Sequence, residues 1–118
     1  MSNKTLNYKV LLVFAPVLIL IGIAGFLIPK DAALTSGEPA YNIFHIIFGA
    51  IGLILLFIRS ENYIRAFNVG FGLIDLYQAL ASFAHFFPEQ YFRWTRVDDV
   101  LHIVIGAGLV AVGLIKRR

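Results

Sequence analysis

Four long apolar segments, separated by short polar breaks, make up most of the chain. They cover Tyr8–Ile28, Tyr41–Ile58, Tyr63–Phe87 and Val97–Ile115. A helix needs about 20 apolar residues to cross the roughly 30 Å hydrocarbon core of a bilayer, and each segment is close to that length. Proline, glycine and charged residues gather in the breaks, as is typical of connections between helices. The pattern predicts four membrane-spanning helices.

A polar motif occurs twice within these segments. Asn42-x-x-His45 opens the second segment and Asp99-x-x-His102 lies near the start of the fourth, each followed by Ile-x-x-Gly-Ala. Residues three and four apart share one face of a helix, so each motif forms a strip along its helix. The repetition predicts two helical hairpins related as a parallel internal repeat, with the axis along the membrane normal.

The third segment carries a polar stripe of its own. Its members share one helix face and are Asp75, Gln78, Ser82 and His85. Asp75 is expected about 15 Å deep, near the bilayer centre, where a carboxylate costs about 2.5–3.5 kcal/mol. Because of that cost, we expect Asp75 to face the bundle. The sequence thus predicts a buried polar network of Asn42, Asp75, Gln78, Ser82 and Asp99.

Composition agrees with a membrane protein. Of the 118 residues, 59% are hydrophobic and only 14% are charged, and the mean hydropathy is +0.81. A soluble domain averages about 45–50% apolar and about 25% charged residues. The whole chain, residues 1–118, is therefore expected to be one transmembrane domain in contact with lipid. The absence of cysteine excludes disulfides, thiolate metal sites and cysteine nucleophiles.

The basic residues orient the predicted bundle. One side holds Lys4, Lys9, Arg59, Arg65, Lys116, Arg117 and Arg118, whereas the other holds Lys30, Arg93 and Arg96. By the positive-inside rule, both termini are expected in the cytoplasm and the chain in a bacterial inner membrane. The net charge of +3 then reflects topology, and no nucleic-acid partner is expected, since the basic residues flank the spans instead of lining a groove.

All three histidines are predicted to lie in one layer near the outer face. His45 and His102 either form hydrogen bonds between helices or serve as ligands. As ligands they could hold a haem or chlorin, or bind a divalent metal ion together with His85. Asn42 and Asp99 would orient the rings, or would act only as helix caps. For His85, a capping role at the interface is the alternative.

The motifs resemble those of a family of small bacterial four-span membrane proteins of unknown function. The matching residues are Asn42, His45, Gly49, Gly52, Leu53, Gly72, Asp75, Asp99, His102 and Gly106. This resemblance covers the second to fourth segments and implies the same topology and repeat. It implies no activity, and His85 lies outside the shared pattern.

Three classes of function remain open, and none of them is enzymatic. No metalloprotease, nucleophile-elbow, phosphate-loop or dinucleotide motif is present, so the chain is not expected to be an enzyme. The first class is an accessory or structural subunit of a larger membrane assembly or homo-oligomer. The second is a haem, chlorin or metal binder acting through His45 and His102. The third is a proton or ion pathway through Asp75.

Overall fold

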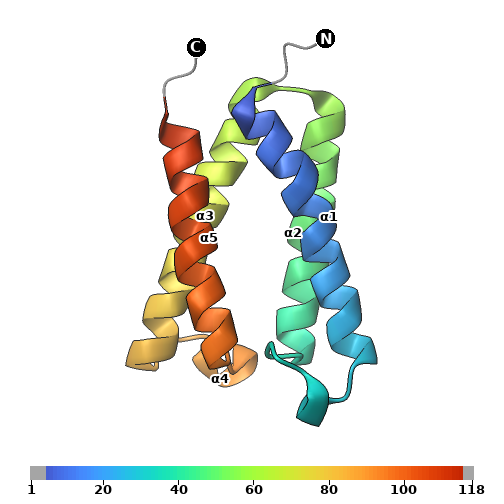
Figure 1. Cartoon of the computed structure of the whole chain (residues 1–118), viewed down its shortest axis with the longest axis vertical. Coiled ribbons are helices and arrows are strands. Elements are labelled where there is room, and N and C mark those ends of the chain that lie inside the picture. The colour runs from blue at the N-terminus through green and yellow to red at the C-terminus, as the bar shows by residue number, and fades with distance from the viewer. Residues whose placement is uncertain (1–4, 116–118) are drawn as a thin grey trace.

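The computed structural model describes residues 5–115, apart from the side chain of Lys30, and this part of the chain is helical without strands. Four long helices run along one another, namely α1 (Leu6–Leu27), α2 (Pro39–Ile58), α3 (Glu61–Ala84) and α5 (Arg96–Leu114) (Figure 1). Two short helices, η1 (Lys30–Ala32) and α4 (Glu89–Phe92), lie in the connections. The predicted all-α fold is confirmed.

The two ends of the bundle differ in what they hold. α1 begins and α5 ends at the same end, which we call the terminal end, and the turn between α2 and α3 is there too (Figure 1). The opposite end, the loop end, holds the connection from α1 to α2 and the connection from α3 to α5, which contains α4.

Local caps account for the small differences between predicted and observed helix ends. Thr5, Ser60 and Thr95 each accept a hydrogen bond from a backbone N–H of the helix that follows, which starts α1, α3 and α5 one or two residues earlier than predicted. At its other end, α3 stops at Ala84 and not at Phe87, because His85 takes a left-handed conformation with φ 63°.

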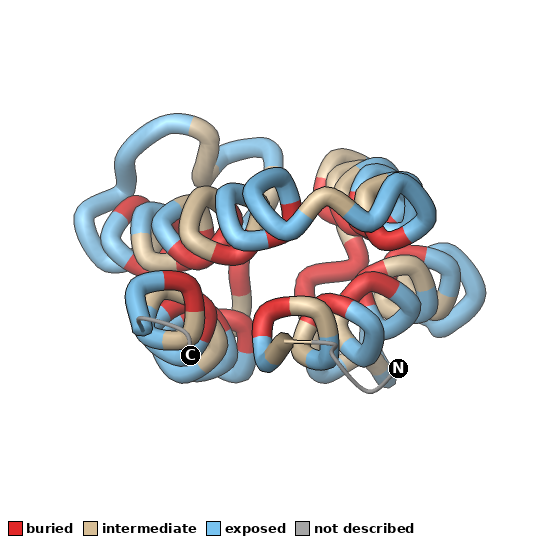
Figure 2. The backbone as a smooth tube through the Cα atoms, turned by 90° about the horizontal axis from the view of Figure 1, so that it is seen from above, coloured by how far each residue is buried: buried red, intermediate tan, exposed pale blue. Residues whose placement is uncertain are grey.

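Each half of the chain forms a close hairpin, α1 with α2 and α3 with α5 (Figures 1 and 2). Glycines allow the close approach. A Cβ atom added to Gly49 would lie 2.8 Å from the carbonyl oxygen of Ala15, and one added to Gly106 would lie 2.8 Å from that of Gly72. Small residues at helix contacts are typical of membrane bundles, where backbones must approach without large side chains between them.

The burial pattern of the first hairpin recurs in the second at a constant distance along the chain. His102 follows His45 by 57 positions. When the buried residues of α2 are shifted by the same 57 positions, they coincide with the buried residues of α5. This 57-residue step also takes all five buried residues of α1 to buried residues of α3. The step pairs Ala15 with Gly72 and Gly49 with Gly106, which make the two close backbone contacts described above.

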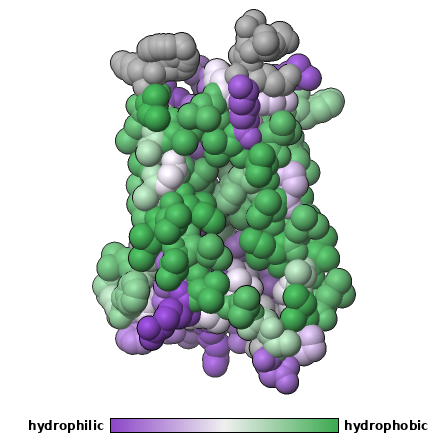
Figure 3. Space-filling view, in the orientation of Figure 1, coloured by the Kyte–Doolittle hydropathy of each residue, from purple (hydrophilic) through white to green (hydrophobic). Residues whose placement is uncertain are grey.

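The outer surface of the bundle suits a bilayer. α1, α2 and α5 are long and apolar enough to cross a membrane. The molecule is 45 Å long, close to the roughly 40–45 Å of a bilayer with its headgroups. Figure 3 shows an apolar face over most of this length, with hydrophilic atoms gathered mainly at the two ends. Three polar residues in the middle of α3, Asn68, Asp75 and Gln78, are buried in the bundle.

Candidate functional site

Asp98 is the hub of a buried polar layer near the loop end. Its side chain is fully buried and accepts three close hydrogen bonds, from the Tyr41 hydroxyl at 2.6 Å, the Ser36 N–H at 2.8 Å and the Thr95 N–H at 2.9 Å. Tyr41 and Ser36 belong to the first hairpin, whereas Asp98 belongs to the second. This carboxylate therefore joins the two halves of the chain. Charge-assisted bonds of this kind are about twice as strong as neutral ones.

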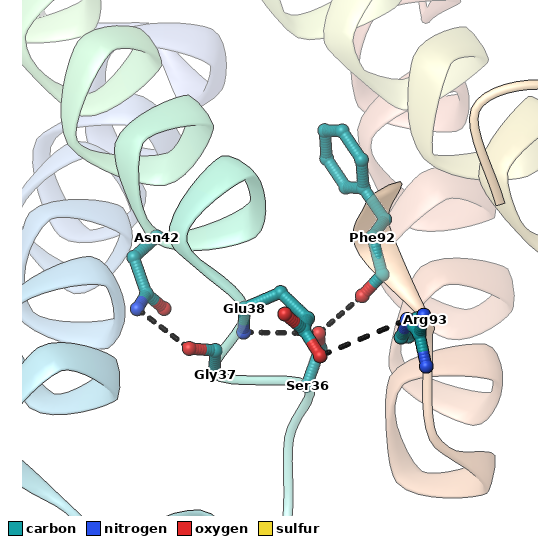
Figure 4. A network of polar contacts seen from close by, with 6 residues as sticks. All are labelled: Ser36, Gly37, Glu38, Asn42, Phe92 and Arg93. Atoms are coloured by element: carbon teal, nitrogen blue, oxygen red, sulfur yellow. Dashed lines mark hydrogen bonds and ion pairs between the residues drawn. The ribbon is translucent and has the colours of Figure 1, made fainter. Parts of the chain in front are cut away.

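The connecting loops extend this junction to the surface of the loop end. The Ser36 hydroxyl donates to the carbonyl oxygen of Phe92 and accepts from the Glu38 N–H at 3.3 Å. Arg93 lies 3.9 Å from the Glu38 carboxylate. Figure 4 shows these contacts reaching from the first hairpin to the segment after α4. The two loops therefore form one polar cluster.

His45 on α2 and His102 on α5 line the same small cavity of about 80 Å³. Both are buried. The Nδ1 atom of His45 lies 2.8 Å from the Tyr41 carbonyl oxygen, a partner that requires a proton on this nitrogen and leaves Nε2 as the acceptor of a neutral ring. The Nδ1 atom of His102 is buried without a hydrogen-bond partner. Trp94 packs edge-on against the His102 ring at 6.2 Å.

Asp75 faces the bundle interior, as predicted. Its side chain is only 3% exposed and lines the histidine cavity. The Gln78 amide donates to Asp75 Oδ1 at 3.3 Å, and its oxygen accepts from Trp94 Nε1 at 3.0 Å. A chain of polar contacts thus runs from α3 to the segment before α5.

The cavity lies where the two hairpins meet. Eight of its lining residues form four pairs separated by the 57-residue step, namely Phe14 with Phe71, Leu18 with Asp75, Tyr41 with Asp98 and His45 with His102. Two of these pairs are in direct contact, since the Tyr41 hydroxyl bonds to Asp98 and the Phe14 and Phe71 rings meet at 5.6 Å. Residues separated by the 57-residue step therefore line the cavity from both hairpins.

His85 lies apart from this cavity. It ends α3 on the exposed surface, with its Nδ1 3.9 Å from the Glu89 carboxylate, and it does not line the cavity that holds the other two histidines. Ser82 is half-buried and also lies outside the cavity lining. Within residues 5–115, no three histidine or carboxylate side chains are grouped so as to hold a metal ion.

Asn42 and Asp99 are buried inside their helices, so the interpretation of these residues as helix caps is wrong. The N-caps are Glu38 for α2 and Thr95 for α5. Asn42 instead donates from Nδ2 to the Gly37 carbonyl oxygen at 2.9 Å, anchoring the loop of the first hairpin. One side-chain oxygen of Asn42 and one of Asp99 are buried without a partner.

Sequence reasoning missed the residues that tie the hairpins together, among them Asp98, Asn68 and Asn7. Asp98 was not chosen as a site residue because the motif repeat aligns Asp99 with Asn42. The spacing Thr95-x-x-Asp98 is nevertheless that of a capping box, which the structure contains. Asn68 and Asn7 form a second tie near the terminal end, where Asn68 Nδ2 donates to Asn7 Oδ1 at 3.0 Å. Asn68 is a polar residue inside an apolar segment, and that was the available signal.

The cavity does not fit a haem or chlorin. Pockets for organic ligands of drug size measure about 300–1,000 Å³, several times the 80 Å³ between His45 and His102. Water fits, because one molecule occupies about 30 Å³ in the liquid and needs two to four polar partners. Asp75 and the two histidines provide such partners.

Removing the Asp75 side chain tests whether its carboxyl is needed for packing. Asp75→Asn keeps an oxygen for the Gln78 amide, so folding should be retained. Asp75→Leu leaves that amide without its partner and should destabilise the protein by about 1–3 kcal/mol. Reversible unfolding in mixed micelles measures both variants. Equal stability of the Asn and Leu variants would show that the buried carboxyl is incidental.

Comparisons of the chain with protein-family models, with curated proteins and with solved structures found no match. The resemblance to small four-span bacterial membrane proteins therefore stays a prediction.

Proposed function

We propose that this protein is a non-catalytic accessory or structural subunit of a larger membrane assembly. The observation that carries the proposal is that buried polar groups form hydrogen bonds between the two hairpins. Tyr41, Ser36 and Asp98 bond across the two hairpins at one end of the bundle, and Asn7 and Asn68 do so nearer the other. The cavity among the ionisable groups holds about 80 Å³, room for water but not for an organic substrate.

The proposed architecture is a duplicated helical hairpin. Its support is the 57-residue step. This step relates the buried face of α1 to that of α3 and the buried face of α2 to that of α5. It also relates the two close backbone contacts to each other and forms the four residue pairs around the cavity. Repeats of parallel orientation have their axis along the membrane normal. On this proposal, the ancestral protein was a single hairpin that packed against a second copy of itself. The positions now occupied by Tyr41 and Asp98, and by His45 and His102, lay where the two copies met.

All four long helices are proposed to span the membrane, with the terminal end in the cytoplasm. α3 packs along α5 over the length of the bundle and buries Asn68, Asp75 and Gln78. In the sequence, seven basic residues lie at or next to the helix ends of the terminal end, namely Lys4, Lys9, Arg59, Arg65, Lys116, Arg117 and Arg118. The loop end has three, Lys30, Arg93 and Arg96, beside five carboxylates. The positive-inside rule places the more basic end in the cytoplasm.

Cysteine labelling tests this orientation, and the chain has no cysteine of its own. Leu34→Cys, at a residue 75% exposed in the loop end, should react with a membrane-impermeant maleimide in cells whose inner membrane is intact. Asn62→Cys, exposed at the terminal end, should react only after that membrane is permeabilised. The reverse pattern would show that the topology is inverted. Labelling of both cysteines from one side would show that α2 does not cross the membrane.

The accessory role itself is tested in the native membrane. The full chain, tagged and expressed from its own promoter, should cross-link to a membrane protein whose abundance falls when this chain is deleted. Restoring the chain should restore that abundance. If the chain migrates as a monomer in mild detergent and its deletion changes the abundance of no other membrane protein, the accessory role is excluded.

A proton-exchange site is the second candidate, because His102 Nδ1 lacks a partner in a cavity shared with Asp75 and His45. Water in this cavity would connect the three groups. Purified protein in liposomes with an internal pH dye should then speed proton entry, and Asp75→Asn should return it to the rate of protein-free vesicles. Identical rates for the wild type, the variant and empty liposomes would exclude this candidate.

A further inference from the structure

A wide apolar groove runs between α1 and α5 on the outside of the bundle. Its volume is about 480 Å³, and its lining is Lys9, Val10, Val13, Phe14, Val17, Ile105, Gly108, Leu109 and Val112. The face that α1 and α5 form lies toward the viewer in Figure 3 and is largely apolar. From Lys9 to Val17 the groove extends about 12 Å along the helix axis, at about 1.5 Å per residue.

The corresponding side of the bundle, between α2 and α3, carries phenylalanines that pack against one another. Phe48 and Phe67 lie there, with ring centroids 5.2 Å and 5.6 Å from Phe71. The residue 57 positions after Phe48 is Ile105, and the residue 57 positions before Phe67 is Val10. Both of these smaller residues line the open groove between α1 and α5. At these two positions the α2–α3 side thus carries aromatic rings, whereas the α1–α5 side carries the smaller Val10 and Ile105.

Gly108 widens the open groove further. A Cβ atom built at this residue meets nothing within 4 Å, so the glycine is not required by packing inside the protein. A groove of this volume falls within the range of ligand sites, about 300–1,000 Å³.

One end of the groove is positively charged. Lys9 lies in the first turn of α1, near the terminal end, and its side chain is exposed. Basic residues between helices at the cytoplasmic surface attract anionic lipid headgroups. The other lining residues are apolar and match a hydrocarbon chain.

We propose that this groove binds an acyl chain of one anionic phospholipid of the inner leaflet, with the headgroup phosphate at Lys9. The proposal rests on the cytoplasmic orientation of the terminal end and needs no partner protein. Dispersion contacts with the apolar lining hold the chain, and the charge of Lys9 selects the headgroup.

The test uses the full chain reconstituted in bilayers of equal parts phosphatidylglycerol and phosphatidylcholine, then released into mild detergent for native mass spectrometry. The wild type should retain one phosphatidylglycerol. The double variant Val10→Phe with Ile105→Phe places phenylalanines in the groove, as at Phe67 and Phe48 on the α2–α3 side, and should reduce retention of the lipid at least tenfold. Lys9→Gln should lower the preference for phosphatidylglycerol over phosphatidylcholine about fivefold.

A matched control places phenylalanines elsewhere on the apolar surface. Leu20→Phe with Val104→Phe alters residues that are 63% and 64% exposed and lie outside the groove lining, so retention should equal that of the wild type. Equal retention by the filled-groove variant, equal loss in the control, or a second copy of the chain bound in place of lipid would overturn the proposal. A reversed cysteine-labelling pattern would instead overturn the topology and leave lipid retention unaffected.

Discussion

Replacing Asp98 with leucine is expected to destabilise the protein by at least about 3 kcal/mol. The substitution leaves the Tyr41 hydroxyl and the N–H groups of Ser36 and Thr95 without their acceptor inside the bundle. Each unsatisfied buried donor costs about 1–3 kcal/mol. Unfolding in mixed micelles of rising denaturing detergent measures the loss.

Two variants serve as controls for this result. Asp98→Asn keeps one oxygen for the two N–H donors and can donate to the Tyr41 hydroxyl, so its cost should be much smaller. Asp99→Asn changes the neighbouring carboxyl, which has a buried oxygen without a partner, and should change stability little. If the Asp98→Leu and Asp99→Asn variants unfold at the same point, Asp98 is not the hub of the layer.

The second large effect is expected at Gly106. Even the methyl group of Gly106→Ala would lie 2.8 Å from the Gly72 carbonyl oxygen, so α3 and α5 would have to separate. Overpacking of this kind costs about 1–3 kcal/mol. A loss of about 2 kcal/mol or more is therefore expected in the same unfolding assay.

Gly108 is the matched control, two residues further along the same helix. A Cβ atom there meets nothing within 4 Å, and alanine favours a helix over glycine by up to about 1 kcal/mol. Gly108→Ala should therefore be neutral or stabilising. Equal destabilisation by both alanine variants would contradict the packing account, because a Cβ atom at Gly108 makes no close contact.

The four long helices could be predicted from the sequence because each is a long and largely apolar segment, although only α1, α2 and α5 are apolar enough to cross a membrane by composition alone. Their ends shifted by one to three residues, since caps such as Thr5 and the left-handed His85 set the ends locally. The inward direction of Asp75 was also predictable, because a carboxyl in contact with lipid is costly. These features depend on nearby residues and on the solvent alone.

The bonds across the layer could not be predicted in the same way. Tyr41 and Asp98 are 57 positions apart, and their contact depends on how the two hairpins pack. The motif comparison favoured Asp99, which is buried but does not line the cavity. His85 shares its helix face with Asp75 by spacing, but α3 ends before the face continues to it.

A double-mutant cycle between Tyr41 and Asp98 tests most directly whether the buried layer joins the two hairpins. The stabilities of Tyr41→Phe, Asp98→Ala and the double variant are measured by reversible unfolding in mixed micelles. A direct bond across the hairpins predicts that the double variant loses about 1–2 kcal/mol less than the sum of the single variants. Additivity within about 0.5 kcal/mol would contradict the central claim.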